Sequence, residues 1–430
     1  MRKIFTEESQ KSQTLKRASE IMKGLPCKLE ELGTMSLLKF GSETILRAAI
    51  LEEICDHLGR GHYEHSGNNG KLGYRNGDCL TTIDTPLGPV TYNRPKLTGA
   101  KNFKSKFHTP YIRRPEEFAD QVAEMYVNGI STRKIKRALS AAGDNIKMSR
   151  STVSRITERL REQWRQWKKR DLSELKVAYL FLDAIHLGMR MGGTSKQAVF
   201  VAYAVMEDGS FEVLSIGLGN SESDKSWGSF LQDLKSRGLK DPLLVCSDGN
   251  GSVIKAIEAH CPTSWRQRCV KHKMENILER IPKEDQKDLR PQLNRIFYGA
   301  TSLEQARSFV DSFKKDYGKK YPEALSILMS DIDQCLSFYL FPHNHWKRIR
   351  TSNGLERMNL EIRRRLNVVG RHPSEEGCLS LIFQVTKRYA KDQTPNSFKV
   401  TEFTKKQWTK LRADKITMAQ DLLDLFTDAA

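Results

Sequence analysis

Hydrophobic residues recur every three to four positions near the start of the chain, which is the spacing of an amphipathic helix. Ile45, Leu46, Ala49, Ile50 and Ile54 follow this spacing. We therefore expect a helical N-terminal region over residues 1–58. Over 59–110 the composition changes to Gly, Asn, Thr and Pro, and the segment TTIDTPLGPVTYNRPKL alternates on both sides of a Pro-Leu-Gly-Pro turn. This segment predicts a β-hairpin.

Three short helical segments follow over 111–172. The first ends at Asn128-Gly129, a helix-stop signal, and Gly143 separates the second from the third. Three helices joined by short turns are typical of a helix-turn-helix unit, whose last helix lies in the major groove of DNA, and equally of a purely structural bundle. The residues that such a unit would bring to DNA are Arg133, Lys134, Ser149, Arg150, Ser151, Thr152 and Arg155.

An alternation of every second residue replaces the helical spacing from Val177 onward. The segments VAYLFLDAIHLGMRM and QAVFVAYAVMEDGSFEVLSIGLG predict three successive strands, with a tight turn at Asp208-Gly209 between the second and the third. SWGSFLQDLKSRGL then predicts a helix, PLLVCSD an apolar strand, and a second helix begins near Ser252. The order βββαβα predicts an α/β domain with a mixed sheet over 173–267.

Helical spacing returns over 268–344, so a helical block interrupts the α/β domain. The segment SNGLERMNLEIRRRL, which begins at Ser352, predicts a strong helix, and CLSLIFQVTKRYA predicts one more. We assign both helices, within 345–395, to the final part of the α/β domain. The remaining residues, 396–430, are expected to form a poorly ordered or peripheral C-terminal tail.

The balance of charge adds an expected partner. Lysine and arginine outnumber aspartate and glutamate by 71 to 52 among the 430 residues, which gives a formal net charge of +19. Such a chain attracts polyanions, and a nucleic acid is the leading candidate, with an anionic membrane surface or simple solubility as the alternatives. The hairpin region, which carries Arg75 and Arg94, is therefore a further candidate DNA contact.

No stretch approaches the roughly 18 consecutive apolar residues of a membrane span, and the N-terminal residues MRKIFTEESQ turn polar at once. We therefore expect a cytoplasmic protein with no membrane partner. The eight cysteines are scattered along the chain, which does not suit a disulfide framework. Most of them are expected to be reduced thiols.

Three acidic residues are candidates for holding metal ions. Asp183 lies mid-strand in LFLDAIH, Asp248 ends a strand in LLVCSDGNG, and Glu356 lies in the first turns of a basic helix. Two aspartates and a glutamate can hold two hard cations and leave positions for phosphate and water, as in-line phosphodiester cleavage requires. Asp183 and Asp248 would meet if the first and fourth strands are neighbours. Each acid taken singly also fits a structural role, in a salt bridge, an Asp-Gly turn or an exposed helix face.

Basic residues cluster on both sides of Glu356, with fewer acids among them than an ordinary solvated helix face carries. We expect contacts with the phosphate backbone of a nucleic acid here, and a solubilising stripe is the alternative. The members of this basic cluster are Lys347, Arg348, Arg350, Arg357, Arg363, Arg364 and Arg365.

Cys269 and His272 form a C-x-x-H pair in RQRCVKH, and His343 and His345 lie later in the chain. Four such ligands can form a tetrahedral zinc site. A single C-x-x-H is a weak signal, however, and a packed thiol beside a hydrogen-bonded histidine is the more common arrangement. Zinc is therefore not expected as a cofactor.

Four segments together resemble the Mutator-type transposases of bacterial insertion sequences. They are LFLDAIH at Leu180, LLVCSDGNG at Leu243, RQRCVKH at Arg266 and HWKRIRTSNGLERMNLEIRRRLNVVGRHP at His345. Further matches upstream extend the resemblance over most of the chain: GYRNGD at Gly73, GISTRKIKRAL at Gly129 and SRSTVSRITERL at Ser149. The segment at His345 is the most specific of these motifs.

The resemblance implies an RNase H-like catalytic domain with a DDE triad, interrupted by a helical insertion before the final glutamate. Matched residue by residue, the triad falls on Asp183, Asp248 and Glu356, and the family's C-x-x-H falls on Cys269 and His272. Polar positions around the family's glutamate match Asn353, Arg357 and Asn359. The resemblance also implies magnesium, or manganese in its place, as the working cofactor.

The implied partner is double-stranded DNA, both the terminal inverted repeats of an insertion sequence and the target. The implied reaction frees a 3′-OH at each end of the element and joins it to target DNA. Because two ends must be held together, a homodimer or a higher oligomer on DNA is expected, in the cytoplasm and associated with the nucleoid.

Two positions depart from the family's pattern. Asp183-Ala184 is followed by Ile185 where the family commonly has threonine, and Gly354 replaces the usual proline of the final motif. The main alternative is a catalytically inactive, sequence-specific DNA-binding protein or repressor on the same fold. A nuclease or junction resolvase, which cleaves DNA without joining it, is a third hypothesis.

Overall fold

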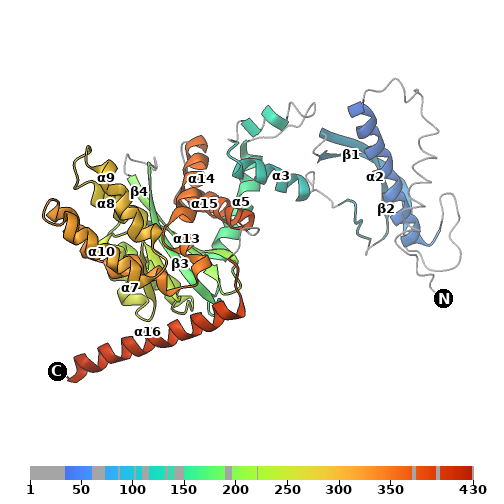
Figure 1. Cartoon of the computed structure of the whole chain (residues 1–430). Coiled ribbons are helices and arrows are strands. Elements are labelled where there is room, and N and C mark those ends of the chain that lie inside the picture. The colour runs from blue at the N-terminus through green and yellow to red at the C-terminus, as the bar shows by residue number, and fades with distance from the viewer. Residues whose placement is uncertain are drawn as a thin grey trace. The chain divides into compact units, whose positions relative to one another are not determined.

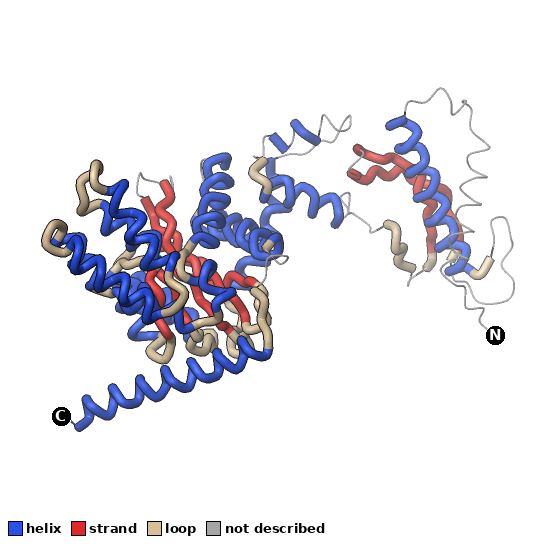
Figure 2. Tube along the Cα trace, in the orientation of Figure 1, coloured by secondary structure: helices blue, strands red, loops and turns tan. Residues whose placement is uncertain are grey.

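The computed structural model describes residues 34–60, 73–85, 88–100, 103–108, 116–130, 134–135, 137–139, 150–188, 196–219, 221–369, 374–393 and 398–428 (Figures 1 and 2). The chain divides into two compact units, Met1–Glu158 and Arg159–Ala430. Helix α5 (Arg150–Lys168) crosses this division. The finer division into seven parts stays a prediction from the sequence.

The described part of the first unit includes a helix and an antiparallel hairpin. They are α2 (Thr34–Leu58), β1 (Tyr74–Thr85) and β2 (Gly88–Thr98). Ile50, Ile54 and Leu58 recur at helical spacing on one side of α2 and pack against Tyr92 of β2. The predicted hairpin is confirmed, and so is the predicted helix over 34–58; the rest of the predicted helical region, 1–33, lies outside the described residues.

Three helical segments share a core in the rest of the first unit. They are α3 (Glu116–Val127), the helical residues 134–135 and 137–139, and the start of α5. Phe118 and Val122 of α3 pack with Ile135, Leu139 and Ile156 of the other two segments. A small helical cluster is therefore present where three helices are predicted, although the turn between the second and third segments lies outside the described residues.

The second unit is built on a five-stranded mixed sheet with the order β5-β4-β3-β6-β7. Its strands are β3 (Val177–Gly188), β4 (Lys196–Met206), β5 (Phe211–Gly219), β6 (Leu244–Ser247) and β7 (Trp265–Arg268). β4 is antiparallel to both of its neighbours, β3 and β5, whereas β3, β6 and β7 run parallel. The predicted α/β domain is confirmed, and β7 is an additional strand that the sequence did not predict.

The turn between β4 and β5 needs a glycine. Gly209 has a φ of +88°, and a Cβ at this position would collide with the carbonyl oxygen of Phe398. The predicted Asp208-Gly209 turn is therefore confirmed, and the close approach of the chain near Phe398 depends on it.

Alternate residues of β3 face opposite sides of the sheet. Leu180 and Leu182 face α6 (Asp224–Ser236) and α7 (Gly251–His260), and they share a core with Trp227 of α6. Tyr179, Phe181 and Asp183 belong to the other alternate set. Asp183 therefore faces the side of the sheet against which α14 packs.

The helical block lies between β7 and α14. It contains α8 (Val270–Leu278), α9 (Gln286–Asn294), α10 (Leu303–Tyr317), α11 (Pro322–Met329) and α12 (Ile332–Leu336). Lys273 of α8 is fully buried and pairs with Asp331, which also binds Arg268 at the end of β7. This buried charge cluster joins the helical block to the edge of the sheet.

Four helices complete the second unit. They are α13 (Trp346–Ile349), α14 (Asn353–Val369), α15 (Glu375–Asp392) and α16 (Glu402–Asp428). The sequence analysis expected only a tail over 396–430, whereas α16 is a long helix (Figure 1). Trp408 of α16 is buried and donates a hydrogen bond to the Tyr179 hydroxyl at 2.9 Å, so the first part of α16 belongs to the folded core. Among the described helices, none combines the length and apolarity that a membrane crossing needs.

Candidate active site

Asp183 lies within β3, and Asp248 directly follows β6, the strand that runs parallel beside it. Phe181 of β3 is paired in register with Cys246 of β6, and each aspartate lies two residues beyond its member of this pair. Adjacent strands lie about 4.8 Å apart, and residues two apart on a strand share a face. The two carboxylates therefore lie near one another, and the charge of Asp248 acts on Asp183. This confirms the condition that the first and fourth strands of the domain are neighbours.

Asp183 is held from two directions. Its Oδ1 accepts a hydrogen bond from the Ala184 backbone N–H at 2.9 Å, and its Oδ2 accepts one from Nδ2 of Asn359 at 2.7 Å. The pKa of Asp183 is raised to about 6, chiefly by burial and also by the negative charge of Asp248, although these hydrogen bonds lower it. A positive ion between the two aspartates would offset the repulsion between them.

Glu356 lies in the first turn of α14, three residues before Asn359 and thus on the same side of the helix. Its Oε2 accepts a charged hydrogen bond from Lys271 of α8 at 2.6 Å. Its Oε1 is buried and has no hydrogen-bond partner within the described part of the chain. Because Asn359 fixes α14 to Asp183, Glu356 is carried on the helix that borders the two aspartates.

The described residues contain no group of three His, Cys, Asp or Glu side chains placed to hold a single metal ion. Magnesium is commonly bound by one or two protein carboxylates and takes its remaining oxygens from water and substrate phosphates. The Asp183–Asp248 pair meets that requirement. The unpaired Oε1 of Glu356 and the buried, unpaired Oδ1 of Asn359 are further oxygens that a hydrated ion could use. The side chains present therefore fit a hard divalent ion.

Cys269 and His272 lie beside the acids. Cys269 is buried at the start of α8, and its sulfur accepts hydrogen bonds from the backbone N–H and the hydroxyl of Ser352, both at 3.4 Å. Contact with Cys269 raises the pKa of His272 to about 9 against the effect of burial, and the charges of Asp183 and Asp248 raise it further. This pair therefore joins α8 to the turn before α14, beside the aspartates.

The histidines considered with that pair have other neighbours. The Nδ1 of His345 lies 2.7 Å from the Tyr179 hydroxyl, and its Nε2 lies 3.1 Å from the Lys399 carbonyl oxygen. The ring of His343 packs edge-on against Trp346. Neither contact involves the C-x-x-H pair.

The basic cluster separates into two groups. Arg350 is partly buried and lies over the Tyr298 ring, while Arg364 and Arg365 pair with Glu361. The other members are exposed: Lys347, Arg348, Arg357 and Arg363. Within the described residues, Lys347, Arg357 and Arg363 present charge to solvent without a carboxylate partner.

The residues predicted for a helix-turn-helix are described only in part. Lys134 and Arg155 are exposed. Arg133 and Ser149 lie outside the described residues, and so do the side chains of Arg150, Ser151 and Thr152, which are in the first turn of α5.

Lys271 is the site residue that the sequence analysis missed. It lies two residues after Cys269, inside the motif that was recognised, but one lysine in a chain with 71 lysines and arginines carries little signal. Its importance comes only from the contact with Glu356.

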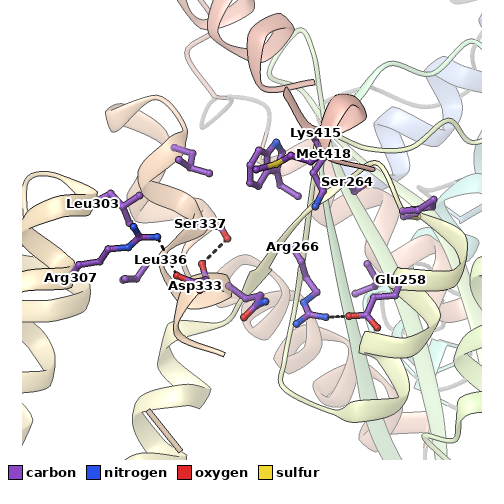
Figure 3. Close-up of a pocket in the computed structure, with 16 residues that line it drawn as sticks. Glu258, Ser264, Arg266, Leu303, Arg307, Asp333, Leu336, Ser337, Lys415 and Met418 are labelled. Carbon is purple, nitrogen blue, oxygen red and sulfur yellow. Dashed lines mark hydrogen bonds and ion pairs between the residues drawn. The ribbon is translucent and has the colours of Figure 1, made fainter. Parts of the chain in front are cut away.

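A separate cavity of about 510 Å³ lies among α7, β7, α10, α12 and α16 (Figure 3). Its charged groups are largely paired, Arg266 with Glu258 and Arg307 with Asp333. None of the three predicted acids lines it. This cavity is therefore distinct from the candidate active site.

Comparison with known proteins gives the family. A family model described as "Transposase, Mutator family" matches residues 13–394. The chain is 33% identical over 340 residues to the transposase for insertion sequence element ISRM5 of Rhizobium meliloti, which covers 79% of this chain and 84% of that protein. It is 28% identical over 344 residues to the transposase for IS256 in transposon Tn4001 of Staphylococcus aureus, which covers 79% and 86%. The chain therefore belongs to the Mutator family of transposases.

Proposed function

We propose that this transposase binds the terminal inverted repeats of an insertion sequence, cleaves DNA to free a 3′-OH at each end, and joins that hydroxyl to target DNA. The observation that carries the proposal is the closeness of Asp183 and Asp248, each two residues beyond the paired Phe181 and Cys246 of adjacent strands. Asn359 fixes the helix of Glu356 to Asp183. Oxygen ligands from three separated elements meet the chemical needs of phosphodiester cleavage.

Magnesium or manganese ions, when bound, would activate the attacking hydroxyl and stabilise the leaving oxygen. Asp183 and Asp248 would hold them, and Glu356 would contribute its free Oε1. Asn359 keeps the Asp183 carboxylate in one orientation by donating to its Oδ2. When no metal ion is bound, Lys271 balances the negative charge of Glu356. This ion pair reduces the repulsion between Glu356 and the two aspartates.

Several features support the finer proposal. The strand order, with the first and fourth strands adjacent, and the helical block before the glutamate helix agree with an RNase H-like catalytic domain with an insertion. The helical cluster of the first unit and the exposed Lys134 and Arg155 support DNA recognition by a helix-turn-helix, with the β1–β2 hairpin as a further contact. We also propose a homodimer or a higher oligomer on DNA, acting in the cytoplasm at the nucleoid.

The test replaces each acid by its amide in Asp183→Asn, Asp248→Asn and Glu356→Gln. Magnesium-dependent nicking of DNA that contains an element end should be lost in all three variants, while DNA binding persists. Asp311→Asn, which removes an equal charge from an exposed position on α10, is the matched control and should nick normally. Unchanged nicking in the three variants would overturn the catalytic assignment.

One observation favours the alternative, a DNA-binding protein or repressor that does not cleave. The ion pair with Lys271 occupies one oxygen of Glu356 and competes with a metal ion for it. This alternative predicts that the unmodified chain binds end DNA but does not nick it at any magnesium concentration. Cleavage without joining to a second DNA would instead indicate a nuclease.

A further inference from the structure

A cavity of about 430 Å³ opens beside the first turn of α14. Phe181 lines it from β3 and, being two residues from Asp183 on one strand, faces the same side of the sheet. Asn353 and Arg357, which lie on both sides of Glu356 in the sequence, line it from α14. The cavity therefore borders the candidate active site but contains none of the three acids.

Aromatic rings form much of its wall. Tyr203 and Phe211 stack with ring centroids 5.6 Å apart and ring planes 19° apart. Phe211 and Tyr389 are half-buried, and the Tyr389 hydroxyl donates to the Gly354 carbonyl oxygen at 3.2 Å, which fixes that ring. Half-buried rings at a cavity can stack against a flat aromatic group of a ligand.

Positive charge lines the same cavity. Lys347 and Arg357 are exposed, and within the described residues neither has a carboxylate partner. The N-terminus of α14, a helix of 17 residues, adds unpaired backbone N–H groups near Asn353 and Gly354. These groups favour an anion such as phosphate.

Thr351 provides an independent sign of a ligand. Its side chain is only 5% exposed, and its Oγ1 is buried with no hydrogen-bond partner among the described residues. Thr351 lines the cavity two residues before α14 begins. An unpaired buried hydroxyl is unfavourable, so this group is expected to pair with a ligand that enters the cavity.

We propose that this cavity, the nucleotide pocket, binds one unstacked nucleotide of the DNA substrate. The base stacks on Phe211 and Tyr389, its phosphate lies near Lys347 and Arg357, and the Thr351 hydroxyl hydrogen-bonds to the nucleotide. This inference rests on the proposed function. It adds that one nucleotide of the DNA leaves the duplex next to the phosphate that is cut.

Aromatic rings and positively charged side chains together select for a nucleotide. Aromatic walls alone would accept any flat apolar ligand, and cations alone would accept any phosphate; a nucleotide satisfies both at once. In a paired duplex the base is already stacked, so binding in the pocket must compete with that stacking. Unpaired DNA should therefore bind more tightly than the same sequence fully paired.

The test uses the full chain, no divalent ion, and two DNA probes of one sequence. One is fully paired; the other is a fork whose unpaired arm carries 5-iododeoxyuridine. Phe211→Leu removes a stacking ring and Thr351→Val removes the unpaired hydroxyl. Phe309→Leu, which removes a partly buried ring on α10, is the matched control. Photo-cross-links are mapped by mass spectrometry, and thermal unfolding is recorded for every variant.

We expect cross-links at Phe211 or Tyr389 and a loss of affinity for the fork of about fivefold or more in both pocket variants, with unchanged affinity for the paired duplex. Thr351→Val should not lower the unfolding temperature, since it removes an unpaired buried polar atom, so its loss of binding cannot come from a damaged fold. Cross-links confined to other regions, or equal affinity losses for both probes, would overturn the proposal.

Two further outcomes separate this proposal from others. Thymidine monophosphate at micromolar concentration should not displace the fork; if it does, the pocket binds a free nucleotide rather than a DNA strand. Absence of all DNA binding would contradict the proposed function as a whole, whereas equal binding of the fork and the paired duplex would contradict the nucleotide pocket alone.

Discussion

The side-chain amide of Asn359 on α14 donates a hydrogen bond of 2.7 Å to the Oδ2 of Asp183 on β3. The two residues are 176 positions apart in the chain. This contact joins the helix that carries Glu356 to the strand that carries the first acid of the site, so the geometry of the site depends on it.

Replacing Asn359 by alanine should therefore misorient Asp183. We expect magnesium-dependent nicking to fall by about 10- to 100-fold, as for other residues that orient a metal ligand, with a stability loss of about 1 kcal/mol. Nicking rates across a magnesium titration measure the first effect and urea unfolding the second. Asn367→Ala, at an exposed position later on α14, is the control. Equal behaviour of the two variants would show that the contact does not position Asp183.

Replacing Lys271 by methionine should free the second oxygen of Glu356. If the ion pair competes with metal binding, the magnesium concentration needed for half-maximal nicking should fall several-fold. Stability should change little, because both side chains are partly exposed, at 43% and 28%. Lys283→Met, at an exposed position, is the control. A higher magnesium requirement would instead mean that Lys271 assists the reaction.

The raised pKa of Asp183 predicts how stability varies with pH. Because its folded-state pKa of about 6 lies above the ordinary value of 3.8, its contribution to stability is full below pH 3.8 and is lost as the pH rises through about 6. Without metal at pH 7.5, Asp183→Asn should therefore be more stable than the unmodified chain, by at most about 3 kcal/mol. At pH 4 the difference should disappear.

Divalent ions provide the matching control for that experiment. Magnesium at pH 7.5 should raise the unfolding temperature of the unmodified chain and should leave that of Asp183→Asn nearly unchanged. Thermal unfolding at pH 4 and 7.5, with and without magnesium chloride, measures both effects. Equal stabilisation of both proteins would contradict a role of Asp183 in binding the ion.

The charge cluster between the helical block and the sheet gives a prediction about folding. Asp331 binds both Lys273, which is fully buried, and Arg268. Asp331→Ala leaves these cations without their carboxylate and should destabilise the protein by about 3–5 kcal/mol. Lys273→Met leaves Asp331 paired with Arg268 and should cost less. Urea unfolding compares the two variants, and the reverse order would contradict this account of the cluster.

Much of the α/β unit could be predicted from the sequence because its local signals agree. The strands β3, β4 and β5 alternate cleanly, and Gly209 marks the turn. Strand β7 has the sequence WRQR, which has no apolar alternation, because its pairing with β6 rather than its side chains makes it a strand. The helix α16 was missed because its burial depends on a few anchors, such as Trp408, that reach distant residues.

The candidate site could be predicted from the sequence only in part. Asp183 and Asp248 could be identified as unusual carboxylates, but their common edge follows only from the pairing of β3 with β6. Lys271 and Thr351 carry no local signal at all. Their significance comes from a contact with Glu356 in one case and from an unpaired buried hydroxyl in the other.

The most direct test of the central claim maps the metal site in the protein itself. Iron(II) bound in place of magnesium, with ascorbate and peroxide, generates hydroxyl radicals that cut the nearby backbone. We predict cuts next to Asp183, Asp248 and Glu356 in the unmodified chain, all suppressed by excess magnesium and all lost in Asp183→Asn. Cuts near only one of the three acids, or a pattern unchanged in Asp183→Asn, would contradict the claim that these residues share one metal-binding site.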